Sequence, residues 1–237
     1  MAAIDIRRAD TRFHTEIGWL DSWHSFSFGE HDDPGNTHHG LLRVLNDDIV
    51  TAGSGFGMHG HRDMEIVTWV LEGALEHQDS EGHHGVITPG VAQRMSAGTG
   101  IRHSEMNASK HERVRLLQMW VPPDRSVAPG YEQVDISSRL DGKSLVPLAS
   151  GREADAGVQI HQRDATLWVG PLDSLVTVKV PDAPYVHVFV ARGSATLGSD
   201  DLGPGDAVRL TDAGTLDLTA GADGAELVVW EMHTALA

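Results

Sequence analysis

Short runs of hydrophobic residues, many of them β-branched or alternating with polar ones, recur along the chain between frequent turn residues. The clearest runs are LLRVL (41–45), EIVTWVL (65–71) and LLQMWV (116–121). The turn signals between them include Pro34-Gly35, Asn46-Asp47-Asp48, Glu72-Gly73 and Pro89-Gly90. No long stretch shows an apolar period of 3.6 residues, so helices should be few and short. Short strands with closely spaced turns predict an all-β barrel or sandwich.

A second β-rich region occupies about residues 158–232 and follows a proline-rich connection, PPDRSVAPG (122–130). In both halves a strand ends at a glycine, a Pro-Gly turn follows, and another strand ends in a glycine-containing turn. The pattern begins with WVLEGALEH (69–77) in the first half and with VFVARGSATLG (188–198) in the second. This internal repeat predicts two similar β-barrels, the first over residues 1–125 and the second over residues 126–237.

The composition narrows the classes of function. The chain has 237 residues and a net charge of −16, and its 18 lysines and arginines form no block. Direct nucleic-acid binding is not expected, because a polyanion would be repelled. No apolar run has the length of about 18 residues that a membrane span needs. The opening MAAIDIRRADTRFH lacks the apolar core of a signal peptide, so a cytoplasmic location is expected. The absence of cysteine excludes disulfides, thiolate metal sites and cysteine nucleophiles.

Two pairs of polar residues have the spacing of metal ligands on strands. His59 and His61 lie within GFGMHGHRDMEIVTW (55–69), and His103 and Glu105 lie within SAGTGIRHSEMN (96–107). With 15 histidines in 237 residues, about one His-x-His pair arises by chance. The first pair therefore predicts a metal site only in combination with the second. Side chains two apart on a strand share a face. If the two strands face each other across a barrel, three imidazoles and one carboxylate converge, a set that suits Fe(II), Ni, Cu, Mn, Co or Zn.

Several longer motifs occur in the same order as in a known family. They are GWLDSWHSFSFG (18–29), LRVLNDD (42–48), LEGALEHQDS (71–80) and MSAGTGIRHSEMN (95–107). In these motifs the chain resembles the pirin family of the cupin superfamily, and especially bacterial pirin-like proteins with quercetin 2,3-dioxygenase activity. The resemblance covers most of residues 15–125 closely and the remainder loosely. It implies a bicupin of two tandem jelly-roll barrels, the first holding one metal ion through His59, His61, His103 and Glu105.

The second barrel departs from the metal-site pattern. Its segment matching the first histidine motif, APYVHVFVARG, contains only His187. The C-terminal barrel is therefore expected to be metal-free and to serve packing or partner contacts. One divalent metal ion per chain is expected, with iron(II) as the first choice and Ni, Cu, Co, Mn or Zn as alternatives.

The carboxylate ligand could come from either motif. In many cupins it is the glutamate of the first motif, here Glu65, whereas in pirins it comes from the second motif, here Glu105. Glu65 lies four residues beyond His61, roughly 13 Å along a straight strand. We therefore expect Glu105 to bind the metal and Glu65 to contact the ligands without binding the metal itself. His77 and Asp79 share a strand face and form either an orienting pair near the site or a structural hydrogen bond at a turn.

Two aromatic residues invite a structural interpretation as well as a functional one. Trp69 has the strand parity of His61 and should belong to the core or line the cavity. His24 alternates on one side of its strand with Phe26 and Phe28, which favours a core histidine with satisfied hydrogen bonds.

The resemblance implies a metal-dependent dioxygenase that cleaves flavonols such as quercetin with O2 and releases carbon monoxide. Its partners would be a small phenolic substrate and O2, and its base would be Glu105 or, failing that, Glu65. The alternative is a non-enzymatic, metal-binding regulatory protein of the pirin type with a protein partner. No membrane partner is expected. The residues by themselves predict an open metal site and no particular reaction.

Overall fold

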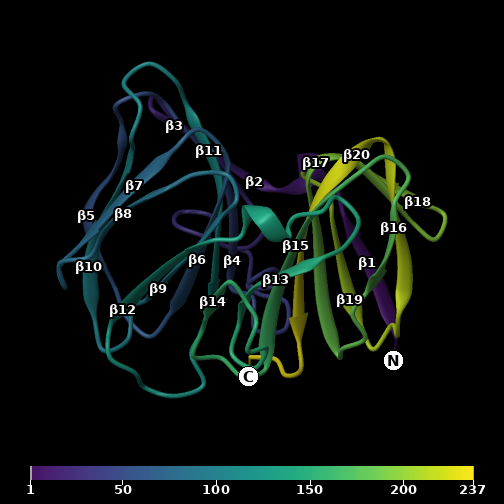
Figure 1. The fold of residues 1–237 in the computed structure, drawn as a ribbon. Helices are drawn as coiled ribbons and strands as arrows, with labels where there is room; N and C mark the ends of the chain where they lie inside the picture. Colours follow the sequence, from purple (N-terminus) through teal and green to yellow (C-terminus); the bar gives the residue numbers. More distant parts are fainter. Residues whose placement is uncertain (1, 237) are drawn as a thin grey trace.

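The chain folds almost wholly into β-strands, arranged as two barrels side by side (Figure 1). The computed structural model describes residues 2–236. Helical structure in this range is limited to two three-residue 3-10 helices, η1 (Ala9–Thr11) and η2 (Ser137–Arg139). The predicted all-β architecture is confirmed, as are the turns at Gly73 and Gly90, whose φ angles of 79° and 88° favour glycine.

No helix among the described residues is long and apolar enough to cross a bilayer.

The N-terminal barrel, coloured purple to teal in Figure 1, consists of two antiparallel sheets. The larger has the strand order β12-β9-β6-β11-β4-β3-β2 and the smaller has the order β5-β10-β7-β8. The strands of the larger sheet are β2 (Phe13–Ile17), β3 (Leu20–His24), β4 (Val44–Val50), β6 (Glu65–Glu72), β9 (Val91–Ser96), β11 (Val114–Val121) and β12 (Gly130–Asp135). Those of the smaller are β5 (Gly55–His61), β7 (Leu75–Asp79), β8 (His84–Ile87) and β10 (Ile101–Asn107).

The C-terminal barrel is one nine-stranded sheet with the path β1-β19-β17-β20-β15-β13-β14, to which β16 and β18 add. Its strands are β1 (Ala3–Arg7), β13 (Val146–Ser150), β14 (Val158–Gln159), β15 (Ala165–Leu172), β16 (Thr177–Val180), β17 (Tyr185–Leu197), β18 (Asp200–Leu202), β19 (Ala207–Thr211) and β20 (Leu216–Met232). Aliphatic side chains such as Val188, Leu210, Leu218 and Val229 fill its interior. This barrel is a packed core.

Two strands lie across the division that the sequence suggests at residue 125. β1 pairs with β19 in the C-terminal sheet, with Ala3 opposite Thr211. β12 pairs with β9 and extends the N-terminal sheet past the proline-rich connection. Strand pairing leaves no local sequence signal, because an edge strand is chosen by a partner far along the chain.

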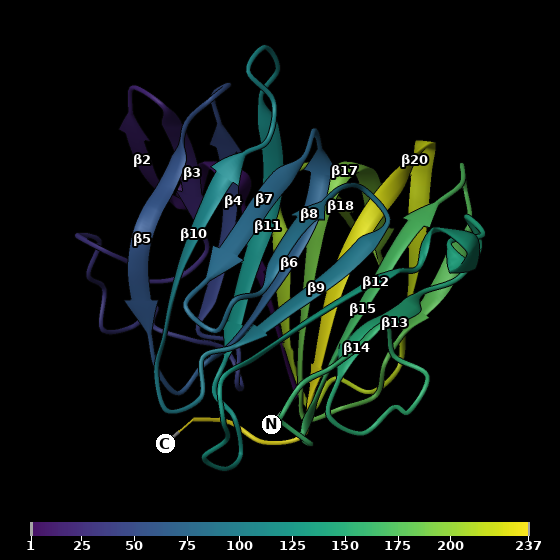
Figure 2. The ribbon, with the colours of Figure 1, turned by 60° about the vertical axis from the view of Figure 1, so that its left-hand side comes forward.

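The two barrels lie side by side (Figure 2), and residues from both make up the largest hydrophobic core of residues 2–236. Trp69 and Met119 from the first barrel pack there with Phe189 and Trp230 from the second. Trp69 also donates a hydrogen bond from its indole Nε1 to Glu226 Oε1 at 2.8 Å. The structure therefore places Trp69 in the core between the barrels, one of the two locations that its strand parity allowed.

An ionic cluster lies beside this core. Asp47 accepts two hydrogen bonds from Arg115, at 2.8 and 2.9 Å, and lies 3.5 Å from Arg12. The Arg115 guanidinium also donates to the backbone oxygen of Ala191 in the second barrel at 3.1 Å. Asp47 thus fixes an arginine that bridges the barrels.

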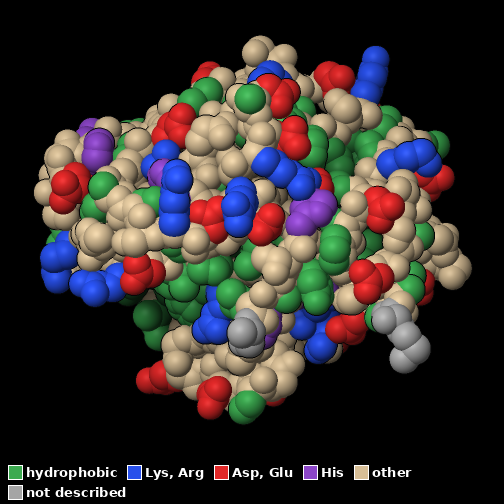
Figure 3. Space-filling model, turned by 90° about the horizontal axis from the view of Figure 1, so that it is seen from below, with side chains coloured by type: hydrophobic (Ala, Val, Ile, Leu, Met, Phe, Trp, Pro, Cys, Tyr) green, Lys and Arg blue, Asp and Glu red, His purple; other side chains and the backbone are tan. Residues whose placement is uncertain are grey.

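The surface carries both charge signs intermixed on the face seen from below (Figure 3). Acidic side chains lie among the basic ones on that face. Such mixing keeps a strongly acidic chain from presenting one continuous field of a single sign there.

His187 on β17 lies beside Phe26 of the first half of the chain, fully buried, and neither of its ring nitrogens has a hydrogen-bond partner in the described part of the chain. Burial, with Arg209 and His39 nearby, lowers its pKa well below 6.5. Below that pH the unfolded chain binds a proton that the folded chain does not, so folding stability falls as pH falls.

Replacing His187 with leucine should therefore flatten this pH dependence. Between about pH 7.5 and 5.5, the wild type should lose about 1.4 kcal/mol more of its unfolding free energy than the variant, the value of one proton over one pH unit. Urea unfolding at both pH values measures this. The neighbouring Phe189→Leu variant should change stability without changing its slope with pH, and equal slopes for His187→Leu and wild type would contradict the prediction.

Candidate metal centre

The two histidine motifs lie on adjacent strands of the smaller N-terminal sheet. β5 and β10 pair antiparallel, with His59 opposite His103 and His61 opposite Ile101. The motifs therefore meet as hydrogen-bonded neighbours, where the sequence suggested opposite walls of a barrel. A Cβ at Gly55 would collide with the backbone of Glu105 and Met106, so this glycine permits the close approach of the two strands.

Three imidazoles gather at this point. Ring centroids are 4.4 Å apart for His59 and His103, 4.7 Å for His59 and His61, and 4.9 Å for His61 and His103. One ring nitrogen from each lies within 4.8 Å of the others, a spacing that could hold a single metal ion. Neighbouring strands with the same side-chain parity bring about this convergence.

The three imidazoles are neutral and have ring nitrogens available to bind a metal. His59 Nδ1 lies 2.8 Å from the backbone oxygen of Gly57, so Nδ1 carries the proton and Nε2 keeps its lone pair. His61 Nε2 and His103 Nε2 are buried and have no hydrogen-bond partner among the residues that the structure describes. Burial and the neighbouring His59 lower the pKa of His61 to about 4 and that of His103 to about 2. Neutral imidazoles with orphaned buried nitrogens fit a divalent cation.

Glu105 stands next to this trio. The β10 strand has an irregular register between His103 and Glu105, which places Glu105 opposite Phe56. Its carboxylate lies within 4.8 Å of ring nitrogens of His103 and His77, so His103 belongs both to this group and to the three-histidine group. Burial raises the pKa of Glu105 to about 7.

A fixed amide orients the Glu105 carboxylate. Gln118 Nε2 donates to Glu105 Oε2 at 2.8 Å, and Gln118 Oε1 accepts from the indole Nε1 of Trp120 at 3.1 Å. An indole N–H only donates, so it determines which end of the Gln118 amide faces Glu105. The carboxylate is therefore held in one position beside His103.

His77 and Asp79 form a polar relay that orients the His103 ring. His103 Nδ1 lies 3.4 Å from His77 Nδ1, and His77 Nε2 lies 3.3 Å from Asp79 Oδ2. Because the Asp79 carboxylate accepts, His77 carries its proton on Nε2 and presents a lone pair at Nδ1. His103 then donates from Nδ1, which leaves its Nε2 free to bind a metal. Tyr131 stacks on the His77 ring at a centroid distance of 4.6 Å and holds it in place.

The structure places Glu65 away from this cluster. Glu65 is fully buried and accepts hydrogen bonds from Ser96 Oγ at 2.9 Å and from the backbone nitrogen of His161 at 3.2 Å. His161 belongs to the second half of the chain, so Glu65 ties the two barrels together. The chain bends at Asp63, where φ is 53°, and β6 begins at Glu65 in the other sheet of the barrel from β5 and His61.

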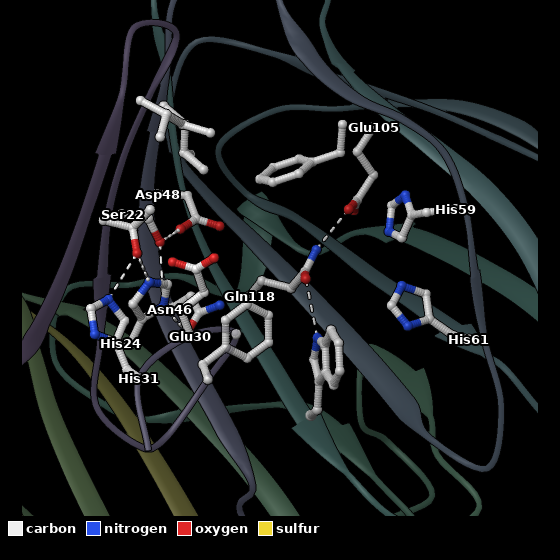
Figure 4. Close-up of a pocket in the computed structure, with 17 residues that line it drawn as sticks. Ser22, His24, Glu30, His31, Asn46, Asp48, His59, His61, Glu105 and Gln118 are labelled. Carbon is white, nitrogen blue, oxygen red and sulfur yellow. Dashed lines mark hydrogen bonds between the residues drawn. The ribbon is translucent and has the colours of Figure 1, made fainter. Parts of the chain in front are cut away.

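A cavity of about 460 Å³ opens onto the metal-ligand candidates (Figure 4). His59, His61 and Glu105 lie at one end, and Ser22, His24, Asn46 and Asp48 lie at the other. Ile17, Leu20, Phe28, Phe56 and Trp120 provide the apolar part of the lining, and Thr15, Glu30, His31 and Gln118 add polar groups. Cavities of this size and character are typical of small-molecule sites.

Sequence reasoning missed the far end of this cavity. Asn46-Asp47-Asp48 was expected to be a turn, but the three residues lie inside β4 and are buried. The missed signal is their position within the hydrophobic run VLNDDIV, where alternation sends Asn46 and Asp48 to one face and Asp47 to the other. His24 has satisfied hydrogen bonds, as expected, and it also lines the cavity.

Comparison with known proteins agrees with this architecture. The Pirin family profile matches residues 6–121, and the profile of the quercetinase C-terminal cupin domain matches residues 147–232. The fold and its histidine cluster therefore define a bicupin with a candidate metal centre in the first barrel. A quercetin 2,3-dioxygenase from Escherichia coli K12 is 39% identical over 227 residues, which cover 95% of this chain and 97% of that protein. The chain belongs to the pirin family, as its motifs predicted.

Further relatives extend the match over the whole length. A protein of Mycobacterium tuberculosis H37Rv with the provisional name quercetin 2,3-dioxygenase is 54% identical over 238 residues, covering 99% of this chain and 97% of its own. The crystal structure of YhhW from Escherichia coli has a TM-score of 0.90 at 37% identity and covers 99% of this chain and 100% of its own. The structure of the bacterial pirin YhhW in complex with nickel(II) has a TM-score of 0.89 at 37% identity, covering 98% and 100%.

Proposed function

We propose that this protein is a metal-dependent dioxygenase that cleaves flavonols such as quercetin with O2 and releases carbon monoxide. The observation that carries the proposal is the set of three imidazoles with available Nε2 atoms at one end of an aromatic-lined cavity. The names of the Escherichia coli and mycobacterial relatives support the choice of reaction.

The metal would be held by His59, His61, His103 and Glu105. Iron(II) is the first choice, and nickel, copper, cobalt, manganese or zinc suit the same donors. Nickel is the ion named for the structure of the bacterial pirin YhhW. A bound divalent ion would supply Lewis-acid stabilisation of the substrate enolate and a meeting point for O2.

The chain's own side chains would bind and deprotonate the substrate. Phe28, Phe56 and Trp120 offer apolar surfaces for flat rings. Glu105 would take the proton from the flavonol hydroxyl, because its carboxylate lines the cavity and is held in position there by Gln118. Glu65, engaged by Ser96 and His161, is not available for that role.

Quercetin consumption and carbon monoxide release under air test the proposal. Metal-free protein and protein reloaded with each of the six metals would be compared, with bound metal measured. Turnover should require metal, disappear in His61→Ala and persist in His111→Ala, an exposed histidine away from the cavity. Absence of turnover with every metal, despite one ion bound per chain, would reject the dioxygenase and favour a regulatory metal-binding protein.

Asp79→Asn should weaken metal binding by about 10- to 100-fold, the usual effect of losing a group that orients a ligand. Its amide would donate to His77 Nε2 and force the His77 proton onto Nδ1. His103 Nδ1 would then accept, which leaves the proton on Nε2, the atom that should bind the metal. Calorimetric titration with Ni(II) measures the change.

The matched control is Glu76→Gln on the same strand, whose partner is the exposed His84. It should bind Ni(II) as the wild type does. Equal affinity of Asp79→Asn and wild type would show that the relay does not set the His103 tautomer.

A further inference from the structure

A second polar cluster lies at the end of the cavity opposite His59 and His61 (Figure 4). It is built on β3 and β4, where Ser22 is directly opposite Asp48 and His24 is opposite Asn46. Ser22 Oγ donates to Asp48 Oδ1, and His24 Nδ1 lies 2.9 Å from Asn46 Oδ1. These pairs hold both β4 side chains in one orientation.

The hydrogen bonds within the cluster also determine which atoms are free. Thr15 Oγ1 lies 3.0 Å from both His24 Nε2 and His31 Nε2. Asn46 Oδ1 can only accept, so His24 donates from Nδ1, and His24 Nε2 then accepts from Thr15, whose oxygen accepts from His31. Asn46 Nδ2 then has its N–H donors free.

Two polar atoms of this cluster have no hydrogen-bond partner in the described part of the protein and face the cavity. Asn46 and Asp48 are each 3% exposed, and both line the cavity. Neither Asn46 Nδ2 nor Asp48 Oδ2 forms a hydrogen bond to any residue in the range 2–236. Both atoms are therefore open to a ligand or to water in the cavity. An adjacent donor and acceptor without partners is the arrangement that one hydroxyl group can satisfy, since a hydroxyl both donates and accepts.

The cluster and the metal-ligand candidates lie on one continuous surface. Asn46 is directly opposite Gln118 in the pairing of β4 with β11, and Gln118 contacts Glu105. Leu20, Phe28 and Phe56 contribute apolar lining to the same cavity. A ligand that reaches from one end to the other would be elongated, apolar in its middle and polar at both ends.

We infer that Asn46 and Asp48 bind a phenolic hydroxyl on the part of the substrate remote from the metal, and so select flavonols with hydroxyl groups on their outer rings. The hydroxyl would donate to Asp48 Oδ2 and accept from Asn46 Nδ2, while Ser22 and His24 keep the pair in position. This inference rests on the proposed function, because that function supplies the flavonol and the end at which it reacts.

The electrostatics of Asp48 agree with this role. Burial raises the pKa of Asp48 to about 7, an effect opposed by the Ser22 hydrogen bond and increased by Asp47 and Glu105. A phenol that donates to Oδ2 would replace a hydrogen bond lost with water and stabilise the ionised carboxylate.

Binding of two probes tests the inference. Quercetin carries hydroxyl groups on its outer rings, whereas 3-hydroxyflavone keeps only the hydroxyl of the reacting ring. Dissociation constants would be measured without O2 on the Ni(II)-loaded protein, so that turnover does not contribute. Asp48→Ala and Asn46→Ala should weaken quercetin binding by about 10- to 100-fold and 3-hydroxyflavone binding by less than about threefold.

Two further variants keep the test sound. Asp48→Asn preserves the shape of the side chain and an acceptor for Ser22. It therefore tests the role of the Asp48 carboxylate in quercetin binding even if the alanine variant fails to fold. Asp21→Ala removes a carboxylate that lies on the same β3 strand, outside the cavity and bonded to His14. It should bind both probes as the wild type does.

The outcomes separate this inference from the proposed function. Equal weakening of both probes, or of neither, would overturn the roles of Asn46 and Asp48 even if quercetin is turned over. Selective loss of quercetin affinity would support those roles even if no metal gives turnover, in which case only the dioxygenase proposal fails. Failure of the wild type to bind quercetin would overturn both.

Discussion

Replacing His103 with alanine should abolish tight binding of a divalent metal ion. His103 is the residue common to both ligand groups, and its Nε2 is buried with no hydrogen-bond partner among residues 2–236. Loss of an orienting group already weakens metal sites by about 10- to 100-fold, so loss of this ligand should weaken binding by more than 100-fold. Titration of metal-free protein with Ni(II), followed by measurement of bound metal after gel filtration, gives the result directly.

His111→Ala is the control for this change. His111 is exposed, and its backbone nitrogen bonds to Ser109 in a bend away from the cluster. The control should retain one ion per chain. Retention of stoichiometric, tight binding by a folded His103→Ala variant would show that the metal lies elsewhere.

Asp47→Ala should lower the free energy of unfolding by about 3–5 kcal/mol, the range found when one partner of a buried ion pair is removed. The Asp47 side chain is 6% exposed and contacts both Arg12 and Arg115. Its loss would leave two guanidinium groups near the barrel interface without their carboxylate. Urea unfolding followed by tryptophan fluorescence and circular dichroism measures the change.

A surface ion pair provides the comparison. Lys179 and Asp217 lie 2.8 Å apart with exposed side chains, so Asp217→Ala should shift the unfolding midpoint little. If both aspartate variants shift the midpoint by the same small amount, the Asp47 cluster does not hold the barrels together.

The periodicity of the sequence predicts the strands and the two-barrel plan well. Most strands carry a buried face with residues two apart, and turns such as those at Gly73 and Gly90 demand a positive φ angle. The same spacing of two residues put His59 and His61 on one strand face in the sequence analysis, but His103 was expected on an opposite wall of the barrel, whereas β5 and β10 are antiparallel neighbours.

Other features depend on partners far along the chain. Asn46 and Asp48 resemble a turn in local sequence. Ser22 and His24 on the neighbouring strand provide the polar contacts that let them lie inside a strand. Glu65 has a cupin ligand's place in the motif, yet His161 supplies its partner from the other barrel. Long-range contacts of this kind override local preference.

The position of β1 has a consequence for biosynthesis. Ala3 pairs with Thr211, so β1 leaves the ribosome roughly 200 residues before its partner strand. At about 5–20 residues per second, β1 waits about 10–40 s as an unpaired strand, while the N-terminal barrel that follows it can already form. The C-terminal barrel is thus finished by an early segment of the chain, and a nascent chain released before β19 is made would expose β1 to other chains.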